Sequence, residues 1–174
     1  MKSPICDMLG IEFPLLAFSH CRDVVAAVSR AGGFGVFGAT RYLPETLEQE
    51  LKWIDDHVDG KPYGIDVLIP ENISTAGEKN VTWKSLEKRV SQEHRDFTRN
   101  LLKKYNIELT AQSVADNQPQ PFDAKTALQL LEVSFRHPIR LIANALGVPP
   151  GAMIEMGRQH NVPVAALVGS KEHA

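Results

Sequence analysis

The strongest constraint on the fold is a compact strand–helix–strand pattern near the amino terminus. An apolar run at 14–17 is followed by a short amphipathic segment, the pair Gly32-Gly33 and a second apolar run at 34–37. Strands joined through so short a helix can pair only in parallel, so the pattern predicts a βαβ unit. Gly32 or Gly33 suits a helix C-terminus, where a residue that tolerates positive φ is favoured. In such folds the chemistry lies at the carboxyl ends of the strands.

The same alternation of strand and helix continues along the chain. We predict further strands at 63–69, 139–143 and 162–168, with helices at 44–58, 123–135 and 150–159. Because these strands are almost continuously apolar, they indicate a parallel sheet covered by helices. The fold class is therefore α/β, with about five β/α units. Two architectures agree with this pattern: an open doubly wound sheet, and a parallel β/α (TIM-type) barrel that is apparently truncated.

A polar segment at about 70–122 interrupts this alternation. Its central part, 91–105, predicts an exposed helix, and 117–121 is typical of a loop. The helix carries a run of mixed charges that we interpret as a solvated face: Glu93, Arg95, Asp96, Arg99, Lys103 and Lys104. We interpret the segment as an insertion after the third strand, within a single domain at 1–174.

Composition excludes several partners. The net charge of −2 gives no electrostatic basis for binding nucleic acid or an anionic membrane surface. Cys6 and Cys21 form neither a disulfide framework nor a metal-ligand spacing, which favours a reducing compartment. There is no apolar run of a signal peptide and no stretch near the roughly 20 apolar residues of a membrane span. We therefore expect a cytoplasmic protein.

Four segments carry a family resemblance. They are the first βαβ unit with its Ala-Gly-Gly-x-Gly core (14–38), the third strand at 61–67, the fourth-strand segment at 141–150 and the fifth strand with its turn at 162–174. In order and spacing they resemble the nitronate monooxygenase (2-nitropropane dioxygenase-like) family. The resemblance covers the chain except for the insertion.

This resemblance implies a fold, a cofactor and a reaction. Family members are β/α barrels that bind FMN and oxidise alkyl nitronates with molecular oxygen. It implies a small-molecule nitronate as substrate, with oxygen as the second reactant. It also implies cofactor-binding positions at Ala17, Phe18, Ser19, Asp66, Asn144, Gly169 and Ser170. It assigns no catalytic acid or base among the residues of this chain.

The chain departs from the family pattern in three places. The family's Ala-Pro-Met after the first strand is Ala17-Phe18-Ser19 here, and its third-strand Asn is Asp66, which can only accept hydrogen bonds when ionised. The family's catalytic-histidine segment and its glycine-rich phosphate segment would lie beyond Ala174. Five strands leave two open sheet edges. We therefore expect one of three arrangements. The chain is part of a longer protein, or another copy in a homo-oligomer or another chain covers the open edges, or the insertion covers one of them.

Structural interpretations compete with the functional ones. Gly32, Gly33 and Gly35 suit helix capping and close packing. His20 and Cys21 are adjacent, an arrangement that seldom makes a nucleophile–base pair. Asp66 would be costly to bury without a partner, so it predicts either a functional site or a pairing with Lys or Arg.

The remaining histidines have simple structural interpretations. We interpret His137 as a turn residue and His173 as a residue on a helix surface. His57, His94 and His160 are expected on polar helices. No cluster has metal-ligand spacing.

Two other functions stay open. One is a different flavin-dependent barrel enzyme, similar to enoyl reductases, that uses a nicotinamide donor. The other is a non-catalytic barrel fragment that self-associates through its open edges.

Overall fold

The computed structural model describes residues 3–40, 42–69, 87–110, 124–145 and 147–170. The chain divides into two compact units, Met1–Asn72 with Ala124–Ala174, and Ile73–Asp123. The first unit carries the sheet. In the second, the described residues form the exposed helix α5.

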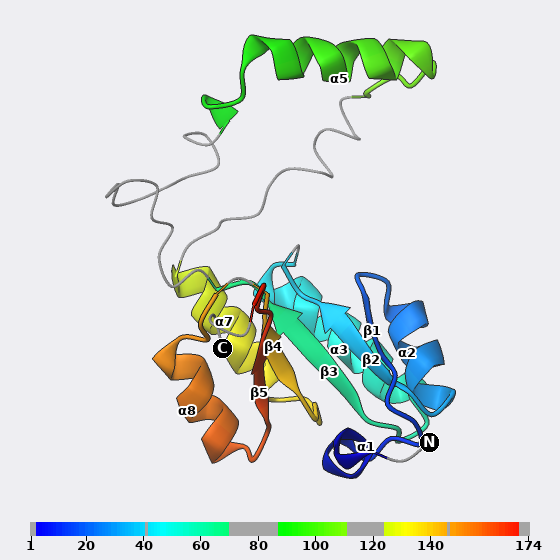
Figure 1. Cartoon of the computed structure of the whole chain (residues 1–174), viewed down its shortest axis with the longest axis vertical. Helices are drawn as coiled ribbons and strands as arrows, with labels where there is room; N and C mark the ends of the chain where they lie inside the picture. The colour runs from blue at the N-terminus through cyan, green and yellow to red at the C-terminus, as the bar shows by residue number, and fades with distance from the viewer. Residues whose placement is uncertain (1–2, 41, 70–86, 111–123, 146, 171–174) are drawn as a thin grey trace. The chain divides into compact units, whose positions relative to one another are not determined.

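The first unit is built on a five-stranded sheet. The strands are β1 (Leu16–Ser19), β2 (Phe34–Gly38), β3 (Tyr63–Val67), β4 (Ile142–Asn144) and β5 (Val164–Ala166). All neighbouring pairs are parallel, and the order in the sheet is β1-β2-β3-β4-β5 (Figure 1). A doubly wound sheet reverses its strand order at a switch point. The unbroken sequential order is that of a β/α barrel wall.

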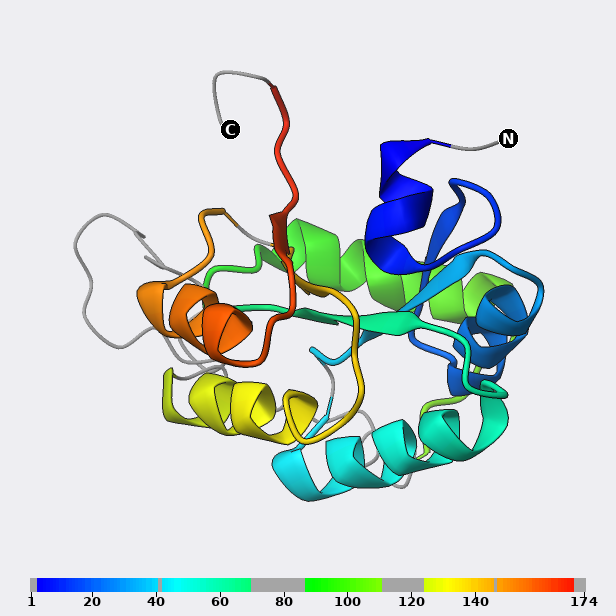
Figure 2. The same cartoon turned by 90° about the horizontal axis from the view of Figure 1, so that it is seen from below.

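Helices cover one face of this sheet. They are α2 (Arg22–Arg30), α3 (Pro44–His57), α7 (Ala124–Ser134) and α8 (Gly151–Gln159). Viewed from below, α3 and α7 run side by side under the sheet, with α8 beside α7 (Figure 2). The main core lies between these helices and the sheet, and includes Leu51, Ile65 and Ile142, none of which is exposed. Burial of such side chains contributes about 1.5–3 kcal/mol each.

The short helix α1 (Pro4–Leu9) lies on the other face. Cys6 and Leu9 pack there with Phe34, Val36 and Leu141 in a second, smaller core. Because Phe34 begins β2 and Leu141 immediately precedes β4, α1 covers this face at the amino ends of the strands. The carboxyl ends are left open on the same face.

Local chemistry explains the βαβ unit. Gly32 has φ of 93°, a left-handed conformation that glycine adopts without steric cost, and it ends the turn after α2. Gly35 lets α2 approach β2, because a Cβ there would lie 2.3 Å from the carbonyl oxygen of Val25. The glycines therefore have the capping and packing roles predicted for them.

In the second unit, α5 spans Gln92–Lys104 and has no buried residue. Ser91 caps it by accepting a hydrogen bond from the backbone N–H of His94. Its mixed charges make surface pairs, such as Arg95 with Glu87 at 3.7 Å. This agrees with the predicted solvated helix; the predicted loop at 117–121 lies outside the described residues.

All five predicted strands form, with shifted ends. The first lies at Leu16–Ser19 rather than 14–17, and the fourth and fifth are shorter than predicted. In an apolar segment, the residues flanking a strand are buried like the strand itself, so the sequence pattern does not mark where the ladder stops.

Candidate functional site

Several predicted residues lie together at the open carboxyl ends of the strands, on the side of the sheet where α1 lies. We call this side the inner face. Parallel register places Phe18 beside Val36, Gly38 beside Asp66, and Asp66 beside Ala143. Side chains alternate between faces along a strand. Because Val36 packs in the α1 core, Phe18, Gly38 and Asp66 share the inner face, at the strand ends where barrel enzymes place their chemistry.

Phe18 and His20 form a pair of rings over Gly38. Their ring centroids lie 5.1 Å apart in an edge-to-face arrangement. A Cβ on Gly38 would lie 2.6 Å from His20 Nδ1 and 2.7 Å from Phe18 Cζ. The missing side chain of Gly38 therefore makes room for both rings. We call Phe18, His20, Gly38 and Asp66 the rim cluster.

His20 is fixed at two points. Its Nδ1 lies 3.0 Å from the carbonyl oxygen of Gly38, a distance at which Nδ1–H donates. The hydroxyl of Tyr42 donates to the backbone carbonyl of His20 at 3.2 Å. The first contact holds the imidazole at the end of β2, and the second fixes the backbone that carries it. Cys21 is oriented differently, with its thiol 3.6 Å from the carboxylate of Asp23, so the structure gives no Cys–His nucleophile pair here.

Asp66 is the polar centre of the cluster. It is 6% exposed, and its Oδ1 is buried without a hydrogen-bond partner. Burial raises the pKa of Asp66 to about 6, while the charge of His20 and a backbone hydrogen bond from Ala145 act to lower the pKa. No ion pair joins it to a Lys or Arg among the described residues. The pairing with Lys or Arg, one of the two interpretations from sequence, is therefore not seen among the described residues.

Asn144 lies at the same end of the sheet but is occupied within the protein. Fully buried, it accepts a hydrogen bond from the backbone N–H of Ile69 at 2.9 Å and donates to the carbonyl of Ile69 at 3.2 Å. Its amide also lies 3.4 and 3.3 Å from the carbonyl oxygens of Gly147 and Val148. This geometry braces the loops after β3 and β4 against each other.

The other predicted positions lie around the cluster. Ala17 and Ser19 flank Phe18 on β1 and are partly buried; in register they pair with Gly35 and Phe37, on the helix-covered side. The hydroxyl of Ser19 accepts a hydrogen bond from the backbone N–H of Cys21 at 2.9 Å. Gly169 and Ser170 follow the carboxyl end of β5. Sequence reasoning did not include His20 in the site, although its place just after the first strand was a usable signal.

His137 has a role beyond the predicted turn. Its side chain is 7% exposed, with Nδ1 2.6 Å from Asp55 Oδ2 and Nε2 3.4 Å from Glu48 Oε1. Tyr63 donates to the other oxygen of Asp55 at 2.7 Å. The cluster links α3, β3 and the turn after α7 near the amino end of the third strand. His173 lies outside the described residues.

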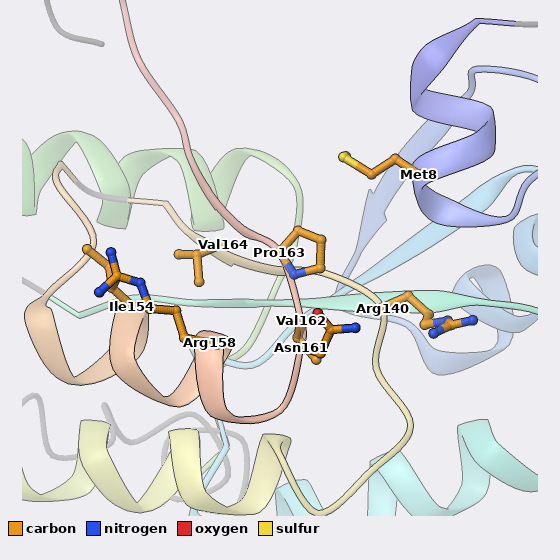
Figure 3. Close-up of a pocket in the computed structure, with 9 residues that line it drawn as sticks. Met8, Arg140, Ile154, Arg158, Asn161, Val162, Pro163 and Val164 are labelled. Atoms are coloured by element: carbon orange, nitrogen blue, oxygen red, sulfur yellow. The ribbon is translucent and has the colours of Figure 1, made fainter.

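A surface pocket lies at the opposite end of the sheet from the rim cluster. It is lined by residues of α1, α8 and the start of β5, with Arg140 and Arg158 among them (Figure 3). The two guanidinium groups extend in opposite directions in this view. They do not converge on a common ligand, and the amino end of a barrel contributes to stability rather than catalysis.

Two absences hold for the residues that the structure describes. No group of three or more His, Cys, Asp or Glu side chains could hold a metal ion. None of the described helices is long and apolar enough to cross a membrane.

Comparison with known proteins identifies the family. The model of the family described as nitronate monooxygenase matches residues 2–174. The chain belongs to the nitronate monooxygenase family. A protein named as a monooxygenase, Rv1533 of Mycobacterium tuberculosis, is 44% identical over all of this chain and 47% of its own length. A protein named as a nitronate monooxygenase in Staphylococcus saprophyticus is 22% identical over all of this chain and 45% of its own length. The chain thus spans about half the length of these relatives.

Solved structures support the barrel. A nitroalkane oxidase from Streptomyces ansochromogenes matches 98% of this chain and 44% of its own, with TM-score 0.63 and 19% identity. FabK (M276A) from Thermotoga maritima matches 99% of this chain and 41% of its own, with TM-score 0.61 and 19% identity. Both are TIM barrels, and at this identity they establish the fold alone. The predictions of a nitronate monooxygenase family member, part of a TIM-type barrel and an oxidoreductase by resemblance are confirmed.

Proposed function

We propose that this chain is part of a flavin-dependent oxidoreductase that uses FMN to oxidise alkyl nitronates with molecular oxygen. Family membership over residues 2–174 supports the reaction class. The observation that carries the proposal is the rim cluster, where an exposed aromatic ring and a buried carboxyl with an unpaired oxygen lie on the two sides of Gly38. It lies at the strand ends where barrel enzymes bind cofactors.

The residues present fit an isoalloxazine ring. Leu16 and Phe18 are 45% and 55% exposed on the inner face and offer an apolar surface of the kind that cofactor sites use. The unpaired Oδ1 of Asp66 offers a hydrogen-bond acceptor beside that surface. When bound, the flavin would supply the electron-accepting chemistry.

The chain's own groups would bind and orient the flavin and shield it from water. Phe18 would contact the ring, and its neighbours Ala17 and Ser19 would hold the β1 end in place. Asp66 would lie beside the ring and face the substrate. Asn144 would act by bracing the two loops beside Asp66, and Gly169-Ser170 would border the site from the β5 side.

Partners and location follow as part of the same proposal. Both edge strands are open in the described sheet, and Leu167 and Val168 after β5 are 63% and 47% exposed. We propose that a second copy or a further polypeptide covers these edges. Both cysteines are free, with Cys6 buried and Cys21 exposed, which suits a reducing cytoplasm.

Oxygen uptake tests the function. The chain, supplied with FMN, should consume oxygen when propane-2-nitronate is added, and omission of either compound should abolish the uptake. Phe18→Ala should lower the rate. Phe97→Ala removes a 66%-exposed ring on α5 and should leave the rate unchanged. Oxidation of NADH or NADPH without nitronate would instead support the enoyl-reductase-like alternative, and no FMN-dependent activity of either kind would refute the proposal for this chain.

A further inference from the structure

Asp66 places an acid where the family resemblance gives a neutral Asn. An amide both donates and accepts hydrogen bonds, whereas an ionised carboxylate only accepts. At 6% exposure, water solvates this carboxyl poorly, and its Oδ1 has no partner. The position therefore favours a ligand group that donates a hydrogen bond, and disfavours one that brings a second negative charge.

The neighbours of Asp66 do little to offset its charge. In register, β2 contributes Gly38 and β4 contributes Ala143, both uncharged. The loop after β4 contributes the backbone N–H of Ala145, and the loop after β1 contributes His20. Among the described residues, His20 is the titratable side chain that acts on Asp66 by its charge.

His20 is a positioning residue in this arrangement. Gly38 holds its Nδ1 and Tyr42 holds its backbone carbonyl, so the ring stays at Gly38, the residue that pairs with Asp66 in register. A protonated imidazole there favours the ionised carboxyl. Loss of the ring would leave Asp66 to ionise at higher pH.

We propose that Asp66 selects the ligand of the rim cluster by charge: when ionised it admits a neutral group, best one that donates an N–H or O–H hydrogen bond, and it admits an anion only after the carboxyl has taken up a proton. The inference rests on the proposed function in taking a nitronate as the anion. A nitronate and its parent nitroalkane differ by one proton and one charge. They are therefore a matched pair of probes for this selection.

The test measures binding of propane-2-nitronate and of 2-nitropropane to the full chain by NMR between about pH 6 and about pH 8. With a carboxyl of pKa about 6, one-proton linkage predicts that nitronate affinity falls about fifty-fold over this range. Neutral 2-nitropropane should bind with little pH dependence. In Asp66→Asn the nitronate affinity should become nearly independent of pH, because the amide carries no charge.

Two further variants sharpen the test. Asp56→Asn changes an exposed carboxyl on α3 and should behave as the unmodified chain does. His20→Gln should move the pH profile for nitronate to higher pH, which a merely structural role would not do. In a carboxyl ¹³C titration, saturating nitronate should raise the midpoint of Asp66, as reciprocal linkage requires.

The proposal is overturned if Asp66→Asn keeps the pH dependence of the unmodified chain, or if folded Asp66→Asn binds no nitronate. An unmoved Asp66 midpoint in saturating nitronate would equally overturn it. These readouts need no turnover. A preserved pH profile without FMN binding would refute the proposed function alone, and FMN-dependent turnover without charge selection would refute this inference alone.

Discussion

Replacing Asp66 by Asn should stabilise the fold at neutral pH, even though it alters a polar residue in the sheet. The carboxyl is held in a site that disfavours its charged form, with a pKa of about 6 against 3.8 for the unperturbed group. The folded state therefore binds a proton more tightly than the unfolded state. Its contribution to stability is fully present below about pH 4 and is lost as pH rises through about 6.

The size of the effect follows from that shift. About two pKa units at 1.36 kcal/mol per unit give about 3 kcal/mol lost between about pH 4 and about pH 7. Asn has nearly the same shape as Asp and avoids this loss. Its amide N–H₂ needs a hydrogen-bond partner, however, and an unpaired amide costs about 1–2 kcal/mol. We expect Asp66→Asn to be more stable than the unmodified chain by about 1–2 kcal/mol near pH 8, and less stable near pH 4.

Urea unfolding followed by circular dichroism, repeated across this pH range, measures the difference. Subtracting the free energies of unfolding of the two proteins removes the titration of every other group. Asp56→Asn, on the exposed face of α3, should give a pH-independent difference. A flat difference for Asp66→Asn would show that Asp66 is not held in a charge-disfavouring site, and would remove the physical basis for its role in the rim cluster.

Three further predictions test other parts of the structure. Gly35→Ala places a Cβ 2.3 Å from the backbone carbonyl oxygen of Val25, so urea unfolding should show a loss of about 1–3 kcal/mol in the free energy of unfolding. An unchanged urea midpoint would contradict the close approach of α2 to β2. Asn144→Ala leaves the backbone N–H and carbonyl of Ile69 without their side-chain partner, so the same assay should show a loss of about 2–4 kcal/mol in the free energy of unfolding. An unchanged free energy of unfolding would mean that the contacts of Asn144 contribute nothing to stability. Sedimentation velocity should show concentration-dependent association through the open edges of β1 and β5, and a monomer at all concentrations would refute self-association of this chain.

The sequence predicted the fold well because its signals are local. Apolar runs, the helix spacing at 44–58 and the left-handed turn at Gly32 each depend on nearby residues. The choice between barrel and doubly wound sheet did not follow from them, because strand order is a property of the whole sheet. Helix α1 was missed, although Pro4 at its first turn and Gly10 after its end are usual helix-terminus signals.

The site was predicted less completely. Phe18 and Asp66 were expected from the family resemblance, and the structure places both near the carboxyl ends of their strands on the inner face. His20 joins them because Gly38, on the next strand, lacks the Cβ that would displace its ring. Asn144 lies where expected, yet its amide is used within the protein, which depends on the path of two loops. Such contacts between loops far apart in sequence leave no periodic signal.

The most direct test of the central claim is the visible absorption spectrum of the purified chain titrated with FMN. We predict that the flavin bands shift and saturate. Phe18→Ala should weaken the binding about two- to tenfold, as loss of an aromatic contact worth about 0.5–1.5 kcal/mol requires. A spectrum of free FMN at every protein concentration, or binding that Phe18→Ala does not change, would contradict the claim that the rim cluster is the flavin-facing site.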